Sequence, residues 1–168
     1  MSWLTRKRRE IGARRAQKEG KTFEKLIVNC AHRELIAIKK SDPPLKQAPS
    51  HTGKTIFWRE KSGADFIIGY KGQMVLFDAK SFDSDKMSFS KLVKHQIDEL
   101  KYWNDHGFRT GYLVNFRSAD IVTFINISCL LSLGPRESIK ATDGLTLGTE
   151  FSFSLKRLFG EQAYSENK

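Results

Sequence analysis

The chain has 168 residues, which is enough for one domain with a sizeable hydrophobic core and short for two. Its 29 lysine and arginine residues outnumber its 19 aspartate and glutamate residues, and the net charge of +10 favours a polyanionic partner, with nucleic acid as the first candidate. No apolar run approaches the ~20 residues that a membrane span needs, which argues against a membrane protein.

The two cysteines, Cys30 and Cys129, lie far apart in the chain and lack the spacing of metal ligands. Isolated cysteines of this kind are typical of proteins in a reducing compartment. We therefore expect both side chains to be buried thiols. The protein is expected to be cytoplasmic, in a cell or in the host of a virus.

The first 21 residues carry most of the net charge, because eight of them are basic and only two are acidic. Such a segment cannot bury enough apolar surface to fold alone, and no apolar stretch follows it as in a signal peptide. We predict a basic N-terminal arm over residues 1–21, either mobile or helical only when bound. Its expected role is phosphate contact. The residues predicted to bind DNA are Arg6, Lys7, Arg8, Arg9, Arg14, Arg15 and Lys18.

Residues 22–160 are expected to form the single folded domain, and residues 161–168 a flexible tail. Within the domain, the apolar residues of segment 22–40 recur at helical spacing, with Thr22 as a candidate N-cap. Residues 41–54 contain three prolines and a glycine, and we predict a loop there. A loop of this length in a compact domain is often functional.

The middle of the chain combines one strong helical pattern with several strand patterns. Residues 88–107 have helical spacing and end at Gly107, a typical C-terminal stop. Beyond residue 128 only two short helical segments are indicated. The runs with strand character are residues 55–61, 65–70, 74–80, 110–117 and 120–127.

Three charged residues interrupt the apolar, β-prone stretch "GADFIIGYKGQMVLFDAKS", namely Asp65, Asp78 and Lys80. Asp78 and Lys80 are two residues apart, so in a strand they share a face. If Lys71-Gly72 is the two-residue turn of a hairpin, Asp65 lies directly across from Asp78 on that face. A three-residue turn with a bulge would instead put Asp65 on the opposite face. We favour the first register, because a lone aspartate inside an apolar strand is costly.

Two carboxylates placed opposite each other repel unless a cation lies between them, and Mg²⁺ prefers such oxygen ligands. Two carboxylates and a metal ion can activate a water and stabilise charge at phosphorus, while an adjacent lysine orients that water or neutralises the developing charge. The alternative is an ion pair between Asp78 and Lys80 at the end of an edge strand, with Asp65 merely opening its strand. Spacing alone leaves both interpretations open.

The pattern of Asp65, Asp78-Ala79-Lys80 and Glu24 in "GKTFEKLI" resembles the PD-(D/E)xK nuclease superfamily. The segments "REKSGADFIIGYKGQMVLFDAKS" and "SFSKLVKHQIDELKYW" are similar in order and spacing to RecU-like Holliday-junction resolvases, and the resemblance covers roughly residues 20–127. It implies an α/β restriction-endonuclease-like core with a mixed central β-sheet flanked by helices. It also implies a Mg²⁺-dependent endonuclease, with Mn²⁺ as a substitute, that acts as a homodimer and resolves four-way DNA junctions by paired nicking.

The resemblance also implies roles for individual residues. Asp65 and Asp78 would bind the metal ion, with the Ala79 carbonyl and Glu24 as further ligands. Lys80 would be the catalytic lysine, and Gln96 would be a polar residue of the next helix near the site. The additional basic partner, expected to contact DNA, would be Lys61 or Lys94, and either of these lysines could equally be a solvated surface charge.

Two departures from the family pattern bear on the substrate. Asp78 stands where these resolvases commonly carry glutamate, and residues 41–60 are shorter and different from the projecting stalk that those enzymes insert into the junction. One alternative is therefore a PD-(D/E)xK nuclease that acts on flaps, ends or a duplex site. Another is a non-catalytic DNA-binding protein of the same fold.

Overall fold

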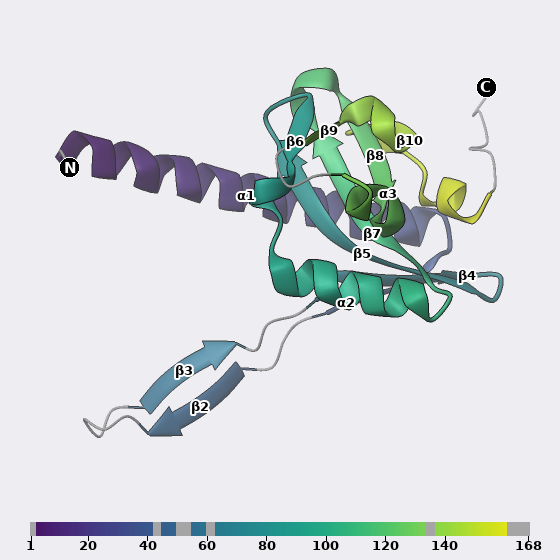
Figure 1. Ribbon diagram of the computed structural model, residues 1–168, viewed down its shortest axis with the longest axis horizontal. Helices are drawn as coiled ribbons and strands as arrows, with labels where there is room; N and C mark the ends of the chain where they lie inside the picture. Colours follow the sequence, from purple (N-terminus) through teal and green to yellow (C-terminus); the bar gives the residue numbers. More distant parts are fainter. Residues whose placement is uncertain (1–2, 42–44, 50–54, 60–62, 134–136, 161–168) are drawn as a thin grey trace.

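The computed structural model describes residues 3–41, 45–49, 55–59, 63–133 and 137–160, and its centre is a seven-stranded sheet (Figure 1). β5 and β7 run parallel, whereas the other neighbouring strands of the described sheet are antiparallel, so the sheet is mixed as predicted. The spatial order of the strands is β1 (Ala37–Lys40), β4 (Phe66–Tyr70), β5 (Gln73–Phe82), β7 (Arg109–Phe116), β8 (Ile121–Asn126), β10 (Leu145–Thr149) and β11 (Ser152–Phe153).

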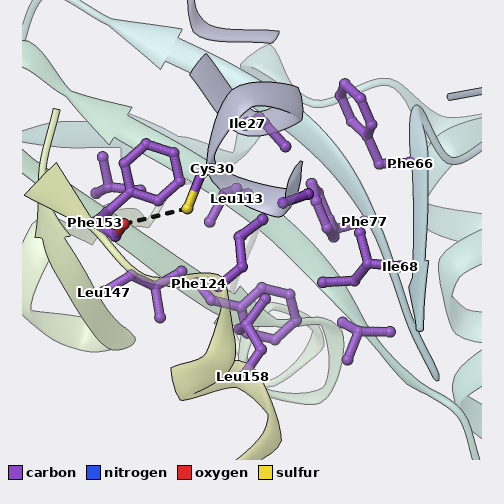
Figure 2. Packing of buried hydrophobic residues seen from close by; sticks show 14 of the residues in the cluster. Ile27, Cys30, Phe66, Ile68, Phe77, Leu113, Phe124, Leu147, Phe153 and Leu158 are labelled. Atoms are coloured by element: carbon purple, nitrogen blue, oxygen red, sulfur yellow. Dashed lines mark hydrogen bonds between the residues drawn. The ribbon is translucent and has the colours of Figure 1, made fainter. Parts of the chain in front are cut away.

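The two long helices, α1 (Trp3–Arg33) and α2 (Lys94–Asp105), cover opposite faces of this sheet. On one face Phe23 of α1 packs in a cluster with Phe77 of β5, part of which Figure 2 shows. On the other face Leu100 of α2 packs in a cluster with Leu76. Successive side chains of a strand point to opposite faces, so the position of each β5 residue decides which helix it meets.

Helix α1 differs from its prediction at both ends. We expected a helix over residues 22–40, but α1 begins at Trp3 and ends at Arg33. Thr22 therefore caps nothing, and its hydroxyl donates to the Lys18 carbonyl oxygen of the preceding turn at 3.0 Å. Leu35 has a left-handed φ of 57°, and the chain after it forms β1 alongside β4. The N-terminal part of α1 extends beyond the body of the domain (Figure 1).

The segment predicted as a loop contains a strand. β2 (Leu45–Pro49) pairs antiparallel with β3 (Thr55–Arg59) in a separate two-stranded sheet, and this hairpin projects from the body (Figure 1). The loop prediction is therefore wrong for residues 45–49. The prolines mark the boundaries of β2 instead of preventing it, because Pro49 is its last residue and the other two precede it. The strand predicted at 55–61 exists over its described residues, Thr55–Arg59, but it lies outside the main sheet.

The predicted helix at 88–107 is shorter in the structure. Its first part forms the end of β6 and η1, and α2 itself begins at Lys94. Gly107 has a φ of +88°, which confirms it as the stop signal. The remaining elements are β6 (Lys86–Ser88), paired with β9 (Ser138–Lys140), the helix α3 (Ile127–Leu131), and the 3₁₀ turns η1 (Phe89–Lys91), η2 (Arg117–Ala119), η3 (Ala141–Asp143) and η4 (Leu155–Phe159).

The two cysteines have different environments. Cys30 belongs to the buried cluster between α1 and the sheet, and its Sγ lies 3.2 Å from the Phe153 carbonyl oxygen (Figure 2). Burial raises the pKa of this thiol to about 11. Cys129 is exposed, so the prediction that it is buried is wrong. The short helix α3 buries Ile127 and Leu130 and leaves Cys129 on its outer side. Among the described helices, none has the length and apolar character to cross a membrane.

Candidate active site at the edge of the sheet

The β4–β5 hairpin sets the register of the acidic residues. Lys71 and Gly72 both have positive φ, 48° and 77°, which is typical of a type I′ turn. Tyr70 pairs with Gln73, and Phe66 pairs with Phe77. The next step of this register brings Asp65, directly before β4, opposite Asp78. The structure thus confirms the two-residue turn and the favoured register.

Four side chains meet on the α2 side of the sheet. The Ala79 amide donates to Asp65 Oδ2 at 3.1 Å, which holds Asp65 against β5. Lys80 Nζ lies 2.5 Å from Asp78 Oδ2. Gln96, from the first turn of α2, bridges this ion pair, because its Nε2 donates to Asp78 Oδ1 at 2.5 Å and its Oε1 accepts from Lys80 Nζ at 3.2 Å. The structure therefore brings together Asp65, Asp78, Lys80 and Gln96, as predicted.

Asp78 is the most perturbed group of this cluster. Its side chain is fully buried, and burial raises its pKa from 3.8 to about 8. The Lys80 ammonium opposes this shift, whereas the neighbouring Asp65 adds to it. Among the described residues Asp78 Oδ2 accepts no hydrogen bond, although Lys80 lies next to it. A buried carboxylate oxygen with unused lone pairs, beside a second carboxylate, is a site that a cation would stabilise.

The donor set of this site fits a hard divalent cation with few protein ligands. Asp65 and Asp78 supply carboxylate oxygen, which Mg²⁺ and Mn²⁺ prefer. Within the described ranges, no group of three or more histidine, cysteine, aspartate or glutamate residues could hold a metal ion. The rest of a coordination shell would come from backbone oxygen, water or substrate, as is usual for Mg²⁺.

Glu24 does not join the acid pair in this structure. Its carboxylate lies 2.8 Å from Lys40 Nζ, at the end of the edge strand β1. The neighbouring Phe23 packs with Phe77 on the α1 side of the sheet, whereas Asp78 lies on the α2 side. The structure therefore places the Glu24 side chain on the face that α1 covers, apart from the acid pair, and its role as a metal ligand stays a prediction.

The residues predicted to bind DNA are spread along α1. Lys7, Arg14, Arg15 and Lys18 are exposed there, and Arg15 pairs with Glu19 at 2.8 Å. The side chains of Arg6, Arg8 and Arg9 lie outside the described part of the structure, as does the whole of Lys61. Lys94 is exposed at the start of α2, and its ammonium pairs with Asp98 at 2.7 Å.

Sequence reasoning missed Tyr112, which neighbours the acid pair. It is opposite Asp78 in the parallel register of β5 and β7, and it is fully buried. Burial, together with the charges of Asp78 and Asp65, raises the pKa of its hydroxyl. This hydroxyl has no hydrogen-bond partner among the described residues. Only the parallel pairing of two strands separated by a helix reveals this proximity, and the sequence carries no local signal for it.

The comparisons with known proteins agree with this geometry. The model of a family described as "Recombination protein U", RecU, matches residues 18–148, which include all four residues of the cluster. The chain belongs to the RecU family. This confirms the resemblance to RecU-like Holliday-junction resolvases and indicates a nuclease that acts in DNA recombination.

A solved structure shares this fold. The RecU-family chain is similar to Hjc, a Holliday junction resolvase from the archaeal hyperthermophile Archaeoglobus fulgidus, with a TM-score of 0.52 and 13% sequence identity. The match covers 76% of this chain and 95% of that chain. At this identity the likeness shows the fold, and it confirms the predicted α/β class with a mixed central sheet. No curated relative matches the chain.

Proposed function

We propose that this protein is a Mg²⁺-dependent endonuclease that resolves four-way DNA junctions by paired nicking. The observation that carries the proposal is the convergence of Asp65, Asp78 and Lys80 on the α2 face of the sheet, at the end of the β4–β5 hairpin away from its turn. Family membership supports a junction as the substrate. Burial, together with the neighbouring Asp65, raises the pKa of Asp78, and this unfavourable charge supports a bound cation.

Asp65 and Asp78 would hold the ion, with the Ala79 carbonyl as a further ligand and Mn²⁺ as a substitute metal. When bound, the metal supplies an activated water and stabilises charge on the phosphate. Lys80 is partly exposed, with 24% of its side chain accessible, so its ammonium can reach a phosphate while staying next to Asp78. Gln96 positions both groups through its two hydrogen bonds and so sets the direction in which the lysine points.

Paired nicking of a four-way junction requires two active sites related by symmetry. Asp65, Asp78 and Lys80 together supply one active site, so we propose a homodimer. The chain leaves the main sheet for β2 and β3 beside the site, because the backbone amide of Ser41, which precedes β2 in the sequence, donates to the Asp65 carbonyl oxygen at 2.8 Å. We propose that this hairpin enters the junction, in the role of the family's projecting stalk.

The basic N-terminal part of α1 is proposed to contact DNA phosphates outside the site. Its exposed lysines and arginines project from the body on a helix, where phosphate contacts add affinity without sequence preference (Figure 1). Lys61 and Lys94 remain candidates for further contacts. Because Lys94 already pairs with Asp98, we expect it to add little to DNA affinity.

The direct test is cleavage of matched four-way, flap and linear duplex substrates with Mg²⁺, with EDTA as the metal-free control. We expect two symmetric nicks in the four-way substrate and none with EDTA. Equal cleavage of the flap or duplex would replace the junction by another DNA substrate. DNA binding without cleavage in either Mg²⁺ or Mn²⁺ would establish a non-catalytic DNA-binding protein instead.

A further inference from the structure

A second site lies at the same edge of the sheet, on the face opposite to the acid pair. An open cavity of about 510 Å³ lies between α1 and the end of β1. Three lysines and one glutamate give it a positive charge. It is lined by Lys21, Glu24, Lys25, Val28, Asn29 and Lys40.

The ion pair between Glu24 and Lys40 accounts for one of the lysines, at 2.8 Å. Lys21 and Lys25 are both exposed and have no ion-pair partner in the described parts of the chain. They are four residues apart on α1, so their side chains are neighbours on the helix surface. Like charges at this spacing destabilise a helix, and an anion bound between them would relieve the repulsion.

The same face of α1 carries a row of exposed basic residues that leads into the cavity. Arg14, Lys18, Lys21 and Lys25 follow one another at intervals of four, three and four residues, which is the spacing of one helix face. The row extends over about 16 Å of the helix axis. It therefore joins the projecting part of α1 to the edge of the sheet.

The cavity is close to the acid pair in the fold. Lys40 pairs with Phe66 in the β1–β4 ladder, and the following residue, Ser41, is hydrogen-bonded to Asp65. A DNA strand that crosses this edge with one phosphate at the acid pair would bring neighbouring phosphates toward α1. Val28 and the aliphatic stems of the lysines offer an apolar wall against which a deoxyribose can pack.

We propose that this cavity is a subsite for the backbone phosphates of the DNA strand next to the cut, held by Lys21 and Lys25. The proposal rests on the proposed nuclease function for its position relative to the cut. Glu24 acts in it as a positioning residue, because its carboxylate holds Lys40 at the edge of the cavity. The row from Arg14 to Lys25 delivers the DNA backbone from the arm to this subsite.

The test compares the double variant Lys21→Ala/Lys25→Ala with a charge-matched control, Lys86→Ala/Lys140→Ala. The control pair consists of two exposed lysines directly opposite each other on β6 and β9, so it also removes two neighbouring like charges. Junction affinity is measured without divalent metal by fluorescence anisotropy over a range of salt concentrations. Circular dichroism checks that α1 stays helical.

We expect the slope of log affinity against log salt to become shallower by about 1.8 in the α1 variant, because two phosphate contacts are lost. If the variant and the wild type bind the junction equally at 1 M salt, this difference in slope makes the variant's affinity about 30-fold weaker at 0.15 M. The control should change the slope by much less. Lys21→Arg/Lys25→Arg, which keeps the charge, should restore the wild-type slope, and Lys21→Gln/Lys25→Gln should behave like the alanine variant.

An unchanged slope in the alanine and glutamine variants, or an equal change in the control, would overturn the phosphate subsite. This outcome is separable from failure of the nuclease proposal. If wild-type protein cuts junctions and the slope is unchanged, the nuclease stands and the subsite falls. If wild-type protein cuts nothing with Mg²⁺ or Mn²⁺ but the slope changes as expected, the subsite stands as a DNA-binding feature and the nuclease proposal falls.

Discussion

The two faces of the sheet edge differ in charge and in exposure. On the α2 side, Asp65 and Asp78 lie together beneath Gln96, and Asp78 is fully buried with a raised pKa. On the α1 side, Lys21 and Lys25 are exposed beside an open cavity. A buried carboxylate beside a second carboxylate favours binding of a small cation, whereas exposed ammonium groups attract an extended polyanion and lose little hydration when it binds. The sheet thus separates the acid pair, which is suited to catalysis, from the lysine-lined cavity, which is suited to DNA binding.

Replacing Asp78 with asparagine should have the largest effect, because it should abolish cleavage at the acid pair and leave DNA binding intact. We expect Asp78→Asn to reduce junction cleavage by at least about a thousandfold, because it removes a charged metal ligand. DNA affinity should stay the same or increase, since a negative charge near phosphate is lost. Single-turnover cleavage and anisotropy measure the two effects separately. Asp98→Asn, which changes an exposed carboxylate of α2, is the matched control. Full activity of Asp78→Asn would exclude this site.

The same substitution should stabilise the metal-free protein. In the folded state the pKa of Asp78 is about 8, above its ordinary value of 3.8, so folding costs free energy once the group must be charged. Stability contributed by Asp78 is therefore lost as pH rises from about 4 through 8. In EDTA at pH 8, we expect Asp78→Asn to unfold with a free energy higher by on the order of a few kcal/mol.

Thermal or urea unfolding of both proteins at pH 5 and pH 8 measures this difference. The gain should be much smaller at pH 5, where folded Asp78 is already protonated. Mg²⁺ should raise the melting temperature of wild type more than that of the variant, because ligand binding stabilises the folded state that binds it. A variant less stable than wild type at pH 8 in EDTA would contradict the inference that burial of Asp78 costs more free energy than its contacts with Lys80 and Gln96 return.

Replacing Gln96 should reduce the cleavage rate by an intermediate factor, because Gln96 contacts Asp78 and Lys80 and would act on the metal ion and the phosphate only through them. We expect Gln96→Leu to slow cleavage by about 10- to 100-fold, with little change in junction affinity. Gln73→Leu, at an exposed position after the hairpin turn, serves as the control. The ratio of the single-turnover rate constants gives the effect. A loss of affinity equal to the loss of rate would show a role in DNA binding instead of positioning.

The residues that sequence reasoning placed correctly are those whose geometry is local. The Lys71-Gly72 turn fixes the pairing of β4 with β5, and strand periodicity then puts Asp65, Asp78 and Lys80 on one face. Gln96 was placed through the family resemblance, because the two segments keep their order and spacing. These relations need only a short stretch of chain.

The features that were missed depend on contacts between distant segments. The face that α1 covers decides where Glu24 lies, and no pattern within the helix specifies that face. Tyr112 meets Asp78 only through parallel pairing across a helix. The start of α1 was also missed, because its basic N-terminal half has too few apolar residues to predict a packed helix. Helical structure there continues from a C-terminal half that the core holds in place.

The smallest expected effect concerns the place where α1 leaves the body. Glu19 lies 2.7 Å from Arg117 of η2 and 2.8 Å from Arg15. Hydrogen bonds from Arg117 first, and then from Arg15, lower the pKa of its carboxyl to about 2. Its contribution to stability is therefore fully present above the unfolded value of 4.5 and is lost as pH falls through about 2.

We expect Glu19→Gln to lower the free energy of unfolding at pH 7 by less than about 1 kcal/mol, because the side chain is partly exposed and solvent screens the pairs. Urea titrations at pH 7 and at pH 3 measure the change, which should shrink at pH 3 because the carboxyl of the unfolded chain, with a pKa of 4.5, is then mostly protonated. The same loss at both values would mean that shape, not charge, anchors the helix at this point. High salt offers a second check, since it should weaken the wild-type pairs while leaving the variant unaffected.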